Sequence, residues 1–214
     1  MPSNPSGIRL SCFYYPDFMV KQLHDQGVKG SQWVTIVPVS DGNSPVCQLD
    51  HSSKEQFVAK DGWFFEGVKG SLLFLEDSEG DENAGMPFRV IDMKTGRKVF
   101  EDSARGGGHL AFAHASDGNM SLRYFRRVGG DCSLAKDGTS CWSKFRSHYG
   151  LALANVPKCM GYRHEGDKEW VPSDKGVPPE TIDTPSAIDY PVVVELFPRP
   201  SIRAVPGPVQ CFAE

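Results

Sequence analysis

The sequence predicts a mainly β protein, either an antiparallel β-sandwich or a small β-propeller-like domain. One observation is the stretch 71–100, where three short apolar runs are separated by turns of glycine, asparagine and aspartate. A second is that similar runs recur along the chain at about the 8–12-residue spacing of sandwiches and barrels. A third is that a single segment, 142–154, has a helical pattern. Together these observations favour a β fold with one short helix.

The choice between sandwich and propeller depends on internal repetition. Segments 62–103 and 109–145 have the length of propeller blades, and the turn Asp92 to Gly96 resembles the outer hairpin turn of a blade. No motif recurs at a fixed period, however, and a propeller requires that recurrence. We therefore place a sandwich, or another β fold without repeats, ahead of a propeller.

Two parts are expected in the chain. Residues 1–7 are rich in proline, serine and asparagine, which predicts a flexible arm. Residues 8–214 are long enough to bury a hydrophobic core, so we expect them to form a single β-rich domain.

Strands are expected where β-branched and aromatic residues alternate between turn residues. In the first part of the chain they are 8–14, 18–23, 32–39, 62–65, 71–76, 87–93, 97–100, 109–114 and 120–128. The segment 46–61 offers only the short apolar run 46–49.

The pattern changes after Gly129. A loop bounded by Cys132 and Cys141 precedes the helix predicted over 142–154, with Ser140 as its N-cap. Segment 155–186 contains five prolines among charged residues, which predicts an ordered but irregular excursion. Strands are expected again at 187–197, 201–205 and 209–212.

The six cysteines form no Cys-x-x-Cys pair of the zinc or redox type, so disulfides are the expected use. Disulfides imply an oxidising compartment, which predicts a secreted or periplasmic protein. The N-terminus does not resemble a signal peptide. We therefore expect a mature chain whose leader has been removed, and a cytosolic protein with free thiols is the alternative.

A set of three disulfides is predicted from the positions of the cysteines. Pairing of the end strands, 9–13 with 209–212, would bring Cys12 to Cys211. A bond between Cys132 and Cys141 would close a short loop, which leaves Cys47 with Cys159.

Charge and hydropathy exclude two classes of partner. The formal net charge of −4 does not attract nucleic acid, whose binding depends on a positive surface. No apolar run approaches the roughly 20 residues that cross a bilayer, so no transmembrane segment is expected.

Aromatic and basic side chains are the candidate ligand contacts. Aromatic faces supply a large contact area at low entropic cost, and the basic run 123–127 would favour an anionic partner. The predicted ligand-binding residues are Trp63, Tyr124, Arg126, Arg127 and Trp142. A place in the core, or on a solvent-facing strand edge, is the alternative for each of them.

The acidic loop after residue 76 is a candidate cation site. Asp77, Glu79 and Asp81 place carboxylates at alternate positions, which is how calcium loops gather their oxygen ligands. The helix-loop-helix pattern is incomplete, because Gly80 precedes Asp81 and Phe88 stands where a glutamate is needed. Solvated carboxylates without a metal are the alternative, and no other cofactor is expected.

The string Thr139 to Trp142 resembles the nucleophile segment of papain-type cysteine proteases. The resemblance implies that Cys141 is a nucleophile, activated at a helix N-terminus. The family also needs a glycine before the serine and a distant histidine and asparagine. His148 lies seven residues on, about 10 Å along a helix, beyond the direct contact of about 3 Å that a base needs. A structural disulfide is the alternative for Cys141.

These observations predict a secreted or periplasmic β-rich module that binds a glycan or a protein partner without catalysis. One alternative is a hydrolase that uses Cys141 as its nucleophile. A second alternative is a structural subunit of a surface assembly.

Overall fold

A computed structural model describes residues 7–25, 27, 29–39, 44–78, 85–105, 111–114, 120–152, 155–164, 167–171 and 183–213. It is mainly β, with 55% of residues in strands and 10% in helices. The predicted fold class is confirmed, and of its two forms the β-sandwich fits.

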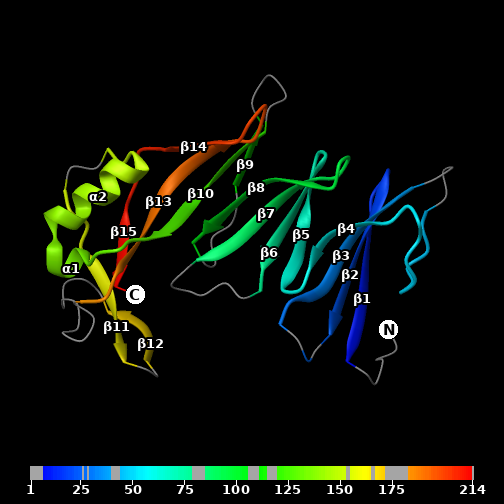
Figure 1. Ribbon diagram of the computed structural model, residues 1–214, viewed down its shortest axis with the longest axis horizontal. Coiled ribbons are helices and arrows are strands. Elements are labelled where there is room, and N and C mark those ends of the chain that lie inside the picture. Colours follow the sequence, from blue (N-terminus) through cyan, green and yellow to red (C-terminus); the bar gives the residue numbers. More distant parts are fainter. Residues whose placement is uncertain are drawn as a thin grey trace. The chain divides into compact units, whose positions relative to one another are not determined.

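The elements follow the chain in the order shown in Figure 1. The strands are β1 (Ile8–Tyr14), β2 (Phe18–Asp25), β3 (Ser31–Pro38), β4 (Gln56–Lys60), β5 (Trp63–Lys69), β6 (Leu72–Asp77), β7 (Met86–Asp92), β8 (Arg97–Ala104), β9 (Ala111–His114), β10 (Met120–Gly129), β11 (Cys159–His164), β12 (Asp167–Val171), β13 (Ser186–Glu195), β14 (Ser201–Ala204) and β15 (Gln210–Ala213). The helices are α1 (Leu134–Asp137) and α2 (Thr139–Tyr149).

The chain divides into two compact units. The first comprises residues 1–80 and 86–102, and the second comprises residues 81–85 and 103–214. The single domain expected over residues 8–214 stays a prediction.

The first unit is a sandwich of two sheets. Strands β1 to β4 are neighbours in chain order and pair antiparallel, and β5 to β8 follow one another in the second sheet. The meander predicted over 71–100 is confirmed as β6, β7 and β8. Alternate residues of both sheets meet in one core, which consists of Val20, Val34, Ile36, Ala59, Trp63, Leu73, Leu75 and Ile91. This burial follows from the period of two that places every second side chain on one face of a strand.

A glycine corner joins the two sheets of the first unit. The backbones of Gly30 and Gly62 approach so closely that a Cβ on Gly30 would lie 2.4 Å from the Cα of Gly62. The N–H of Gly62 donates to the carbonyl of Ser31 at 3.0 Å, and the Ser31 hydroxyl donates to the carbonyl of Trp63. Only glycine permits this approach, because any side chain would meet backbone.

The second unit is organised around β13. This strand pairs antiparallel with β10 from Ala187 to Glu195 and with β15 from Ser186 to Asp189. β15 in turn pairs with β11 in parallel, and β11 forms a hairpin with β12. The short strands β9 and β14 pair with β10 and β13 respectively.

The helical region differs from the prediction at both ends. α2 begins at Thr139, with Gly138 as its N-cap, so Ser140 lies inside the helix. It ends at Tyr149 rather than at residue 154, because Gly150 adopts a left-handed conformation with φ +65°. The preceding short helix α1 was not predicted, and the Ser133 hydroxyl caps it by accepting from the N–H of Lys136.

The observed strands differ from the sequence-based description in three further places. Segment 155–186 is not irregular throughout, because it contains the β11–β12 hairpin, and residues 172–182 lie outside the described part. β4 was not predicted, because segment 46–61 gave only a poor strand signal, and the run 46–49 lies outside the strands. The end strands do not pair with each other, since β1 pairs with β2 and β15 with β13 and β11.

All six cysteines form disulfides, and one of the three predicted pairs is confirmed. Cys132 is bonded to Cys141 as expected, but the other bonds are Cys12–Cys47 and Cys159–Cys211. The predicted bonds Cys12–Cys211 and Cys47–Cys159 are wrong, because the end strands belong to different units and Cys159 faces Cys211 in the β11–β15 register. Three disulfides indicate an oxidising, extracellular environment. Neither described helix has the length and apolarity of a membrane span.

Candidate ligand-binding groove

The structure does not gather the predicted ligand-binding residues on one exposed surface. Trp63, Tyr124, Arg127 and Trp142 are buried, with exposed fractions of 7, 5, 6 and 1%. Arg126 is half-buried. Trp63 belongs to the first unit and the other residues belong to the second.

Trp63 has a packing role in the sandwich core of the first unit. The centre of its ring lies 3.8 Å from the guanidinium carbon of Arg89. Nε of Arg89 donates to Oε2 of Glu101 at 2.6 Å. The indole therefore packs beneath a cation and belongs to the core of the first unit.

Two of the three arginines of β10, Arg126 and Arg127, make different contacts. Arg127 donates from Nε and Nη2 to the two carboxylate oxygens of Asp189, both at 2.7 Å, and stacks on the ring of Phe212 at 4.6 Å. Arg126 donates to the hydroxyl of Tyr190 at 3.2 Å and lies 5.8 Å from the ring centre of Tyr149. Arg126 is therefore the member of the predicted set that approaches the groove described below.

The predicted metal ligands do not form a described site. Asp77 ends β6, whereas Glu79 and Asp81 lie outside the described residues. Among the residues that the structure describes, no group of three histidine, cysteine, aspartate or glutamate side chains could hold a metal ion.

Cys141 is fully buried and bonded to Cys132, so it offers no thiolate to a substrate. A disulfide sulfur cannot act as the nucleophile that the papain-like string implies.

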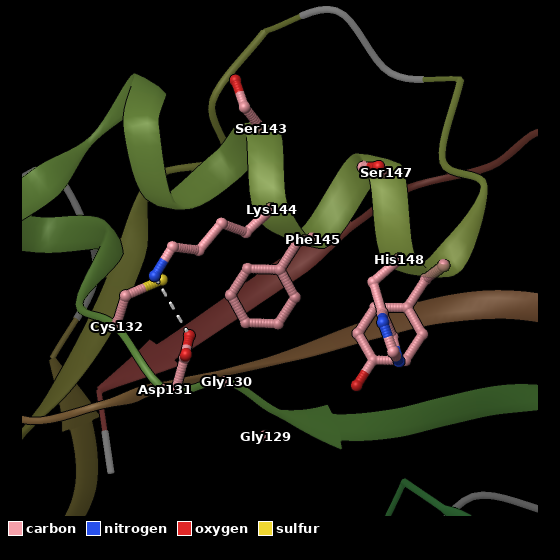
Figure 2. Close-up of a pocket in the computed structure, with 10 residues that line it drawn as sticks. Gly129, Gly130, Asp131, Cys132, Ser143, Lys144, Phe145, Ser147 and His148 are labelled. Carbon is pink, nitrogen blue, oxygen red and sulfur yellow. Dashed lines mark hydrogen bonds and ion pairs between the residues drawn. The ribbon is translucent and has the colours of Figure 1, made fainter.

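A groove of about 970 Å³ opens between α2 and the end of β10 (Figure 2). It lies within the second unit. Its lining residues are Gly129, Gly130, Asp131, Cys132, Ser143, Lys144, Phe145, Ser147, His148 and Tyr149.

The wall opposite α2 depends on Gly130. A Cβ at this position would lie 2.4 Å from Cζ of Phe145, so the absence of a side chain lets the buried ring pack against the backbone. The N–H of Gly130 donates to the carbonyl of Ser186 at 2.9 Å, and the N–H of Ser186 donates to the carbonyl of Cys132 at 3.0 Å. These bonds attach the wall to the start of β13.

The helical wall is held by packing and by a covalent bond. Trp142 and Phe145 are buried with 1 and 3% exposure, and their ring centres lie 6.5 Å apart. The Cys132–Cys141 disulfide joins the first turns of α2 directly to the opposite wall. The groove therefore has two walls whose separation is fixed, which lowers the entropic cost of binding a ligand.

One ion pair joins the two walls. Nζ of Lys144 lies 3.5 Å from Oδ1 of Asp131, and the two side chains are 60 and 83% exposed. Figure 2 shows Lys144 reaching from the helix towards Asp131. An exposed pair of this kind contributes about 0–1 kcal/mol to stability, so both groups can exchange partners at small cost.

Aromatic rings lie at the C-terminal end of the helical wall. The Tyr149 ring lies 4.6 Å from the exposed ring of His148, 6.0 Å from that of Phe145 and 5.9 Å from that of Tyr190. In Figure 2, His148 projects from the same side of α2 as Lys144 and Phe145. The groove thus combines a ring cluster with charged donors and acceptors.

Sequence reasoning did not select Asp131, Lys144, His148 or Tyr149. A partial signal existed, because Lys144 and His148 are four residues apart in the predicted helix, as are Phe145 and Tyr149, and such pairs share one helical face. The approach of Asp131 has no local signal, since it depends on how β10 leads into the disulfide loop.

A second hollow, of about 350 Å³, lies in the first unit beside Lys21 and Glu55. The Glu55 carboxylate lies 3.1 Å from Nζ of Lys21, and Lys21 also donates to the carbonyl of Asp50 at 3.0 Å. These buried charges already satisfy each other, so the groove at α2 is the stronger candidate for a ligand.

Comparison with known proteins gives no match: no family model, no curated protein and no solved structure is significantly similar to this chain.

Proposed function

We propose that the chain is a secreted or periplasmic β-rich binding module that holds a glycan in the groove between α2 and residues 129–132. Export is supported by the three disulfides, which require an oxidising compartment to form and persist. The proposal involves no catalytic step.

One observation carries the proposal, namely that Lys144 and Asp131 face each other beside the ring cluster of Tyr149 and His148. A sugar ring has apolar C–H faces, which pack on aromatic rings, and hydroxyls, which both donate and accept hydrogen bonds. The groove supplies rings, an acceptor in Asp131 and a donor in Lys144. Its volume of about 970 Å³ is at the upper end of the range of roughly 300–1,000 Å³ for ligand pockets.

Hydrolysis has less support from the same residues. The hydroxyl of Ser143 donates to the carbonyl of Thr139 at 2.9 Å, and Asp131 faces Lys144 rather than a histidine. Among the described residues of the groove, no nucleophile contacts a base in the way that covalent catalysis requires.

The test is a glycan array probed with the oxidised full chain, followed by calorimetry on the glycans that bind. Tyr149→Ala and Lys144→Ala should each weaken binding by at least tenfold, equivalent to about 1.4 kcal/mol. Tyr14→Ala and Lys98→Ala are matched controls, because both residues are more than half exposed and lie in the first unit.

Lys144→Ala removes an exposed side chain, so it tests the groove even if loss of the Tyr149 ring disturbs packing. An empty array, or glycan binding that neither groove variant weakens, would overturn the proposal. Capture of a protein through the same two residues, without any glycan, would replace the glycan with a protein partner.

A further inference from the structure

The helical wall of the groove carries basic side chains and no acidic ones. α2 contains Lys144, Arg146 and His148, and no aspartate or glutamate occurs between Thr139 and Tyr149. Lys144 and His148 are one turn apart and both line the groove, whereas Arg146 donates from Nε to the carbonyl of Leu151 at 3.4 Å. The helix therefore presents a lysine and a histidine side chain to a ligand.

Asp131 is the single acidic residue among those that line the groove. It lies 3.5 Å from Nζ of Lys144, at the outer limit of a hydrogen bond, and its side chain is 83% exposed. This carboxylate is therefore an exposed counter-ion of Lys144 that an incoming anion can displace into water. Asp189, by contrast, is bound to Arg127 by two hydrogen bonds.

The charge of the lining depends on His148. Its ring contacts that of Tyr149, and Lys144 and Asp131 line the same groove, whereas Arg126 lies 5.8 Å from the Tyr149 ring. Lys144 and Asp131 cancel, so a neutral imidazole leaves the lining without net charge and a protonated one makes it positive. Imidazole is the side chain that changes charge between about pH 8 and pH 5.

We infer that the glycan is acidic, with a carboxylate or sulfate that binds between Lys144 and His148, and that binding tightens as the pH falls from neutral. The inference rests on the proposed function and names the chemical class of its ligand. The sugar rings pack on the aromatic end of the groove, and the anionic group replaces Asp131 as the partner of Lys144.

The test compares three tetrasaccharide probes with the full oxidised chain: neutral N-acetylchitotetraose, hyaluronan, which carries carboxylates, and chondroitin sulfate, which carries both anions. At about pH 5.5, the acidic probes should bind at least tenfold more tightly than the neutral one. The affinity of the acidic probes should be three- to tenfold lower at about pH 8 than at about pH 5.5, because deprotonation of an imidazole removes a positive charge. Raising the salt from about 0.15 M to about 1 M should weaken the acidic probes only, because it screens exposed charges.

Three variants assign the effect to residues. Lys144→Gln should remove most of the preference for acidic probes, and His148→Gln should abolish the pH dependence of binding. Asp131→Asn should strengthen binding of the acidic probes, since it removes the competing carboxylate. Lys136→Gln is the control, because this exposed lysine of α1 is not part of the groove and lies 2.6 Å from Asp183.

The two proposals can fail separately. Equal affinity for neutral and acidic probes, with no change between the two pH values, would overturn the acidic ligand and leave glycan binding in place. The acidic ligand is also overturned if Asp131→Asn weakens binding of the acidic probes. Failure of every glycan, on the array and among the three probes, would remove the proposed function itself.

Discussion

Two ion pairs of the second unit, Lys144–Asp131 in the groove and Arg127–Asp189 in the interior, differ in solvent exposure and in the distance between the charged groups. Arg127 and Asp189 are 5 and 0% exposed and meet through two hydrogen bonds of 2.7 Å. Lys144 and Asp131 are 60 and 83% exposed and meet at 3.5 Å. The buried pair is shielded from water, and Asp189 also lies 3.7 Å from Nε of Arg105, whereas water can replace either member of the groove pair. The first is suited to hold strands together and the second to exchange with a ligand.

The first unit also contains a buried ion pair, in which the cation is a lysine. Lys21 and Glu55 have side chains that are 2 and 1% exposed, and Glu55 also accepts from the Thr35 hydroxyl at 2.5 Å and the N–H of Ser52 at 3.1 Å. The network attaches the segment before β4 to the outer face of β2 and β3. In both of these described networks, several hydrogen bonds accompany the buried charges.

The sharpest test of the comparison removes one carboxylate from each kind of pair. Asp189→Ala should lower the free energy of unfolding by about 3–5 kcal/mol, because it leaves the Arg127 guanidinium buried without a counter-charge. Asp131→Ala should change it by less than about 0.5 kcal/mol. Urea unfolding followed by tryptophan fluorescence measures both, and equal effects would contradict the distinction.

A second test uses the pH dependence of the Lys21–Glu55 network. Burial acts to raise the pKa of Glu55, but hydrogen bonds from Thr35, His51, Lys21 and the Ser52 N–H outweigh it, so the pKa lies below its ordinary value. A lowered folded-state pKa stabilises the fold at pH values above the unfolded pKa of about 4.3, and this contribution is lost as the pH falls through the folded pKa. At neutral pH, Glu55→Gln should therefore cost about 1.5–3 kcal/mol, the range for hydrogen bonds to charged groups.

The cost of Glu55→Gln should shrink in acid, which unfolding measured at a series of pH values will show. Glu66 provides a control of opposite sign, because burial and repulsion from Glu76 raise its pKa. Its charge destabilises the fold as the pH rises past the unfolded value, so Glu66→Gln should stabilise at neutral pH and have no effect in acid. A Glu55→Gln cost that stays constant down to about pH 3 would contradict the assignment.

A third test concerns the rigid wall of the groove rather than its charges. Gly130→Ala should cost about 1–3 kcal/mol through overpacking, because the new Cβ would lie 2.4 Å from the Phe145 ring. Gly27→Ala is the control, since its Cβ would meet only Asp25 at an ordinary 3.6 Å. Thermal melting compares the two, and a Gly130→Ala variant as stable as the parent would show that the wall is not closely packed.

The smallest effect is expected in the rate at which the disulfides are reduced. Like the ion pairs, the disulfides differ in solvent exposure. Cys12 is half-buried and Cys47 exposed, whereas Cys141 and Cys211 are fully buried. Mild reductant should therefore open Cys12–Cys47 first, since thiol exchange requires access to a sulfur atom. Timed alkylation followed by peptide mass spectrometry gives the order, and earlier opening of Cys132–Cys141 would contradict it.

Much of the β architecture could be predicted because strands leave a local signal. The alternation in 8–14 and the turns between 71 and 100 place β1 and the β6–β8 meander within a few residues of their observed bounds. The Cys132–Cys141 bond was also predictable, because nine residues separate the two cysteines and the loop between them is short. β4 and the β11–β12 hairpin escaped prediction because polar residues and prolines mask their alternation.

The candidate groove, by contrast, was decided by contacts between distant residues. Arg127 and Trp142 looked like surface contacts in the sequence, but the fold pairs Arg127 with Asp189, 62 positions later, and buries Trp142. Asp131 and Lys144 lie 13 positions apart and meet only because a disulfide loop turns α2 back over the end of β10.

Sequence alone determined the fold class, most strands and the oxidised state of the cysteines, since periodicity and composition act within a few residues. Tertiary structure decided which strands pair, which charges are buried and where a ligand fits. The reason is that solvent exposure and cross-strand register are properties of the assembled sheets, and no short segment carries them.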